Sequence, residues 1–183
     1  MIASLSDAWN WYESARRLAR TMGRLGEKHW NNLPWDGDLG RDNHLIDLVS
    51  AEILNDSASV LGDLDDLCVL LLFSVFEAII RERVLAEVQA ELPPLRHVAI
   101  QRALKEMKEG IESGSFFKVM EPYKKCDAHL VEEVNQVRRY RNWVAHGRRT
   151  EQPAAVNPST AYDRLKRFLD LLSASTPLDS QCP

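Results

Sequence analysis

The chain is most apolar over residues 68–80, which read CVLLLFSVFEAII. This run falls well short of the roughly 20 apolar residues that span a bilayer, so we expect no transmembrane helix and no membrane partner. On both sides of it, leucine and valine recur at spacings of three and four from Leu64 to Leu92, and Pro93-Pro94 follows. This pattern predicts a helix over about residues 62–92 whose apolar middle is the buried centre of a helical bundle.

Other segments have the same helical spacing, whereas the alternating β-branched runs that build strands are almost absent. A chain of 183 residues is long enough for one domain with a substantial core. We therefore expect an all-α, up-and-down helical bundle in a single domain over residues 1–183, with a core at about 61–172 and additional N-terminal helices in 1–60. The further helices are expected over about 6–25 with Ser6 as N-cap, 42–56, 95–112, 127–146 and 159–172.

The composition restricts the function in several ways. A net charge of −4 gives no global attraction to nucleic acid, so any phosphate binding must come from a local patch. The first residues lack the basic region and apolar core of a signal peptide, which predicts a cytoplasmic protein. The cysteines form no C-x-x-C pair and the histidines have no ligand spacing, so we expect no metal site and no cofactor.

The clearest candidate for chemistry is RRYRNWVAHG at residues 138–147. In helical projection, Arg141 lies in the middle of an apolar stripe, where a guanidinium is costly unless it is paired or lines a cavity. Glu77, inside the apolar run, is a possible partner for Arg141. Alternatively, Glu77 pairs with Arg81 one turn later, and the sequence leaves both possibilities open.

Five arginines and no acid lie between Arg138 and Arg149, which suggests a patch that faces phosphates. The simpler interpretation is a solvated helix end, where cations interact favourably with the helix dipole. Asn142 and His146 lie one turn apart beside this patch and can touch.

The spacing Arg141-Asn142-x-x-x-His146 on a penultimate helix resembles the R-x4-6-H motif of the HEPN superfamily, and residues 71–81 are similar to the acid-bearing apolar helix that often precedes it. The resemblance implies a metal-independent endoribonuclease, a hydrolase of the toxin–antitoxin or antiviral defence kind. It implies RNA as substrate, a homodimer through the motif helix, and an antitoxin or operon partner protein. Arg148 stands where toxins silenced by a nucleotidyltransferase antitoxin often carry tyrosine, so that mode of regulation is not expected.

In such an enzyme His146 is the general base or acid, because histidine exchanges protons near neutral pH. Arg141 holds the phosphoryl oxygens, and Asn142 orients the imidazole or contacts the substrate. Glu77 supports Arg141. The remaining arginines guide the RNA backbone: Arg138, Arg139, Arg148 and Arg149.

Arg141 and His146 point about 140° apart on an ideal helix, so either a two-fold dimer or an unwound last turn is needed to bring them into one cleft. The alternative function is a non-catalytic HEPN-like module that binds nucleotide, RNA or a partner protein. A plain helical dimerisation adaptor is a third possibility. The N-terminal tryptophans either stack on bases or, more commonly for such residues, pack the first helix and loop against the core.

Overall fold

The structure is a computed structural model that describes residues 2–91 and 97–174. Within these ranges it contains helices, turns and loops but no strand, which confirms the all-α prediction. Three short 3₁₀ turns, Trp30–Asn32, Asp38–Arg41 and Glu121–Lys125, connect the longer elements. The α-helices are α1 (Leu5–Lys28), α2 (Ser50–Glu91), α3 (Val98–Ser113), α4 (Phe116–Met120), α5 (Ala128–Ala145) and α6 (Pro158–Ala174).

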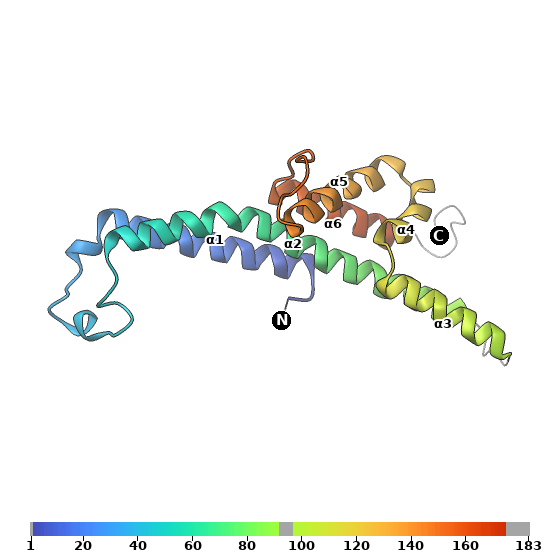
Figure 1. Ribbon diagram of the computed structural model, residues 1–183, viewed down its shortest axis with the longest axis horizontal. Coiled ribbons are helices and arrows are strands. Elements are labelled where there is room, and N and C mark those ends of the chain that lie inside the picture. The colour runs from blue at the N-terminus through green and yellow to red at the C-terminus, as the bar shows by residue number, and fades with distance from the viewer. Residues whose placement is uncertain (1, 92–96, 175–183) are drawn as a thin grey trace.

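Helices α1 and α2 form a long antiparallel hairpin (Figure 1). The two helices approach closely because glycines of α1 face α2. A Cβ atom added to Gly23 would lie 3.3 Å from the Cβ of Ser57, and one added to Gly26 would lie 3.1 Å from Cγ2 of Ile53. Near these glycines α2 packs closely on α1, and farther along the chain it also contacts α5 and α6.

Two sequence predictions are wrong in this hairpin. Separate helices over 42–56 and 62–92 were expected, but α2 runs unbroken through Gly62, and residues 42–49 form turns before it. One exposed glycine inside a helix costs only about 1 kcal/mol, which the packing of α1 along α2 outweighs. The N-cap of α1 is Ser4 rather than Ser6, because Ser4 and Asp7 form a reciprocal capping box.

Helices α5 and α6 pack against the second half of α2 and complete a single core (Figure 1). The middle of α2 is buried, as the apolar pattern predicts. Phe76 is fully buried there and meets the rings of Phe116 and Phe168 edge to face, with centroids 6.0 and 5.6 Å away. The same core includes Leu5, Ala8 and Tyr12 of α1. Thus the start of α1 belongs to the core of the bundle, while its end extends beyond it.

Helix α3 lies beside the end of α2 and projects away from the core, with no buried residue (Figure 1). At the opposite end, the tryptophans of the connecting loop are engaged in packing. Trp30 is buried and donates its indole N–H to the carbonyl of Leu48 at 3.2 Å, and Trp35 donates to the carbonyl of Trp30 at 2.9 Å. Among the described residues, no helix is long and apolar enough to cross a membrane.

Candidate functional site

The motif helix α5 has well-defined ends. Asp127 caps its start by accepting a hydrogen bond from the backbone N–H of Leu130 at 2.8 Å. At its end, Gly147 has a φ of +73°, and the N–H of Arg148 donates to the carbonyl of Trp143 at 2.9 Å. This is the glycine-based closure predicted from the sequence. It places His146 at the boundary where the helix stops.

Arg141 points from α5 toward α2. Its guanidinium carbon lies 5.7 Å from the ring centre of Phe73, and Nη2 lies 3.9 Å from Oε2 of Glu77, which is an ion pair but is too long for a hydrogen bond. Nη1 donates to Oδ1 of Asn142 at 3.0 Å. The buried Nε has no hydrogen-bond partner within the described residues. The arginine is thus positioned on the inner side of α5, with part of its donor capacity unused.

Glu77 makes both of the contacts that the sequence left open, but they differ in quality. Its Oε1 accepts from Nε and Nη2 of Arg81 at 3.0 and 2.5 Å, whereas Arg141 reaches only 3.9 Å. Arg81 also donates to the carbonyl oxygens of Ile111 and Gly114, the latter at 2.9 Å. The Glu77–Arg81 pair therefore ties α2 to the connection between α3 and α4, and Arg141 is a weaker third member.

His146 lies on the outer side of α5, in an open pocket of about 490 Å³. Its side chain is exposed and makes no hydrogen bond or ion pair with the described residues. Arg141 does not line this pocket, whereas Asn142, its hydrogen-bond partner, does. The lining residues are Arg139, Asn142, Trp143, His146, Arg149, Thr150, Glu151 and Pro153.

The predicted arginine patch divides between two sides of the helix. Arg139 and Arg149 line the His146 pocket, although Arg139 also pairs with Glu132 at 2.5 Å. Arg138 turns instead toward α4, where it lies 5.4 Å from the ring centre of Phe117, and burial lowers its pKa. The pocket therefore has two arginines from this patch at its rim.

Arg148 is held by acids from a distant part of the chain. It forms a hydrogen-bonded ion pair with Asp66 and lies 4.0 Å from Asp63, both on α2, and its pKa is raised chiefly by the hydrogen bond to Asp66. Asp66 also accepts a hydrogen bond from the Tyr140 hydroxyl at 2.6 Å. The sequence window around the motif contains no acid, but folding brings these carboxylates to it. They neutralise Arg148, as Glu132 does Arg139, whereas Arg149 has no carboxylate partner among the described residues.

Asp66 was not identified from the sequence, and Tyr140, although it lies in the motif segment, was assigned no role. The only local signal is the pair Asp65-Asp66 at the edge of an apolar helix, since such carboxylates require partners. Asp65 accepts from the hydroxyl of Tyr12 on α1 at 2.7 Å. The two adjacent acids thus fasten α1 and α5 to α2.

No group of three or more potential metal ligands occurs among residues 2–91 and 97–174. Comparison of the chain with protein-family models, curated proteins and solved structures gave no match.

Proposed function

We propose that this protein is a metal-independent endoribonuclease of the HEPN-like kind, acting in toxin–antitoxin or anti-phage defence in the cytoplasm. The observation that carries the proposal is the pocket at the end of α5, where His146 and Asn142 lie together with Arg139 and Arg149. The exposed imidazole has no side-chain partner among the described residues, so it is accessible to a substrate, and two guanidiniums beside it suit a phosphodiester.

The chemistry requires little more than these groups, because RNA carries its own nucleophile. His146 accepts the proton of a 2′-hydroxyl, and the resulting oxygen attacks the adjacent phosphorus. The bond between phosphorus and the 5′-oxygen of the next nucleotide breaks, that oxygen takes up a proton from water, and a 2′,3′-cyclic phosphate remains. The arginines stabilise the negative charge that builds on the phosphoryl oxygens in the transition state.

A homodimer through α5 is part of the proposal. Arg141 faces α2 and His146 faces the outer pocket, so one chain does not present both to the same phosphate. A two-fold axis near the end of α5 would place the motif of one subunit beside that of the other.

The direct test is incubation of the purified protein with mixed-sequence RNA in EDTA, followed by detection of cyclic phosphate ends. We expect His146→Ala and Arg141→Ala to reduce cleavage by about 100-fold or more, as loss of a general base or of a transition-state cation does. His129→Ala is the matched control, because His129 is also an exposed histidine of α5 but lies at its other end. Cleavage by His146→Ala at the parent rate, with the fold intact, would contradict the assigned role.

One observation favours the alternative of a non-catalytic module that binds nucleotide, RNA or a partner protein. Arg141 is engaged with Phe73, Glu77 and Asn142, which is also what a packing residue would do. That function predicts no cyclic phosphate from the parent protein. It also predicts that Arg141→Ala lowers the free energy of unfolding, and that RNA stays intact with this variant as with the parent protein.

A further inference from the structure

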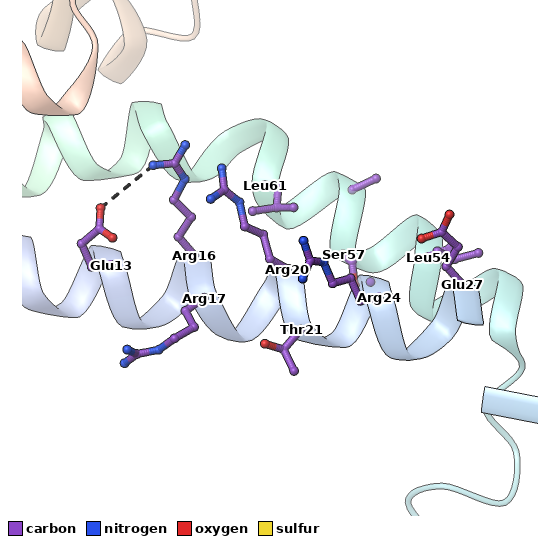
Figure 2. A pocket seen from close by; sticks show the side chains of 12 residues that line it. Glu13, Arg16, Arg17, Arg20, Thr21, Arg24, Glu27, Leu54, Ser57 and Leu61 are labelled. Atoms are coloured by element: carbon purple, nitrogen blue, oxygen red, sulfur yellow. Dashed lines mark ion pairs between the residues drawn. The ribbon is translucent and has the colours of Figure 1, made fainter. Parts of the chain in front are cut away.

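A second feature, unrelated to the motif, is a groove of about 630 Å³ between α1 and the first half of α2 (Figure 2). Arg16, Arg20 and Arg24 line it at spacings of four residues, so they follow one face of α1 over about 12 Å. In Figure 2 these three side chains project to the α2 side of α1, whereas Arg17 extends to the opposite side. The result is a row of guanidiniums along one wall of the groove.

These arginines are largely unneutralised. Arg16 approaches Glu13 only to 4.0 Å, and Arg17, Arg20 and Arg24 make no ion pair or hydrogen bond with other described residues. The acids that line the groove are Glu13 and Glu27, against the three arginines of the row. By contrast, the arginines near the motif mostly have carboxylate partners. A local cationic surplus in a protein of net charge −4 favours binding of an anion at this place.

The α2 wall adds a polar group within an apolar surface. Ser57 lines the groove, and its hydroxyl has no hydrogen-bond partner within the described chain. The hydroxyl oxygen is not among the fully buried atoms that lack a partner, so it keeps contact with solvent and can bond to a molecule in the groove. The close approach of Gly23 to Ser57 sets the floor of the groove. The other lining residues of α2, Leu54, Ala58 and Leu61, are apolar.

We propose that this groove binds single-stranded RNA, with successive phosphates on Arg16, Arg20 and Arg24 and with sugar or base faces against the apolar wall of α2. Repeated cations at regular spacing suit a repeating anion better than a single phosphate. Proteins that bind single-stranded nucleic acid without sequence preference use a positively charged groove that tracks the backbone, with side chains against which the bases lie. The choice of RNA as the polyanion rests on the proposed ribonuclease function, whereas the anion affinity of the groove does not.

The experiment measures binding of a short fluorescent 2′-O-methyl oligouridine, which lacks the attacking hydroxyl and so cannot be cleaved. Fluorescence anisotropy is recorded over a series of salt concentrations. The test variant combines Arg16→Gln, Arg20→Gln and Arg24→Gln. The matched control combines Arg102→Gln, Lys105→Gln and Lys108→Gln on α3, which removes the same charge elsewhere.

Each neutralised phosphate contributes about 0.7 to the slope of log affinity against log salt for a single strand, so the groove variant should lose about 2 from this slope. The ratio of its affinity to that of the parent protein should therefore be about 100-fold lower at 0.1 M salt than at 1 M salt. The α3 control should bind like the parent. Arg20→Gln alone should lose about 0.7 of slope, which keeps the test valid if the triple variant folds poorly. Unchanged binding by the groove variants, or binding of anionic phosphatidylserine vesicles in place of RNA, would overturn the proposal.

Failure of this inference is distinguishable from failure of the proposed function. If RNA binds through the groove but no cyclic phosphate forms with cleavable RNA, the groove assignment stands and the ribonuclease assignment fails. If His146-dependent cleavage occurs but the groove variant binds normally, the ribonuclease assignment stands and the groove assignment fails.

Discussion

The contacts of Glu77 lead to a quantitative prediction about which arginine it supports. Its carboxylate accepts two hydrogen bonds from Arg81, at 3.0 and 2.5 Å, and the side chains of Glu77 and Arg81 are 22% and 14% exposed. Charge-assisted hydrogen bonds that are largely shielded from water contribute about 1.5–3 kcal/mol. We therefore expect a coupling free energy of about 2 kcal/mol between these two residues.

The contact of Glu77 with Arg141 should be worth much less. The two groups are 3.9 Å apart and share no hydrogen bond, and the Arg141 side chain is 29% exposed. Ion pairs of this kind couple by roughly 0.2–1 kcal/mol. Arg141 should instead owe its position mainly to the ring of Phe73 and to Asn142.

Double-mutant cycles measured by urea unfolding separate these values. The single variants are Glu77→Gln, Arg81→Met and Arg141→Met, because methionine retains most of the apolar stem, and each arginine variant is combined with Glu77→Gln. The more exposed helical pair Arg83–Glu87, at 2.9 Å, serves as the control and should couple by about 0.5 kcal/mol. A Glu77–Arg141 coupling equal to or larger than that of Glu77–Arg81 would refute this reasoning and make Glu77 the principal support of Arg141.

Two further predictions concern the packing of α1 and α5 on α2. Gly62→Ala should raise the free energy of unfolding by about 0.5–1 kcal/mol, because nothing lies within 4 Å of the added Cβ, whereas Gly26→Val should lower it by about 1–3 kcal/mol by overlapping Ile53. Urea unfolding measures both free energies, and equal effects of the two substitutions would contradict the close approach of Gly26 to Ile53. Burial, followed by the hydrogen bond to Asp66, raises the pKa of Tyr140 from 10.0 to about 12. The folded state thus retains a proton that the unfolded state loses, so stability should fall between about pH 10 and 12, and less steeply in Tyr140→Phe, as unfolding at several alkaline pH values can show.

The sequence predicted best where strong local signals decide the structure. The bounds of α5 follow from an N-terminal aspartate and a C-terminal glycine, and both positions behave as local chemistry requires. The break expected between residues 56 and 62 is absent for the opposite reason, since the weak local preference at Gly62 is outweighed by packing against α1, a helix that is distant in the sequence.

The electrostatic environment of the motif was only partly predictable. Counting charges between Arg138 and Arg149 gave a uniformly basic segment, but Asp63 and Asp66 lie more than seventy positions earlier and reach Arg148 only after folding. The α1 groove was missed although its signal is visible in the sequence. Arg16, Arg20 and Arg24 recur every four residues, but a row on one helix gains a second wall only when α2 packs beside it.

The geometry of the motif bears directly on how a catalytic site could be assembled. Arg141 contacts α2, His146 lines the outer pocket, and Asn142 alone is associated with both, because it accepts from Arg141 and lines the pocket. A phosphate beside His146 would therefore meet Arg139 and Arg149 of the same chain first. The Arg141 side chain remains 29% exposed, and its buried Nε has no hydrogen-bond partner within the described residues, so the side chain retains capacity for a further acceptor. Five helical positions rotate the two side chains by about 140°, so that acceptor and the His146 pocket of one chain lie in different sectors around the helix. This difference is the reason for proposing a composite site, with the motif helix at a dimer interface.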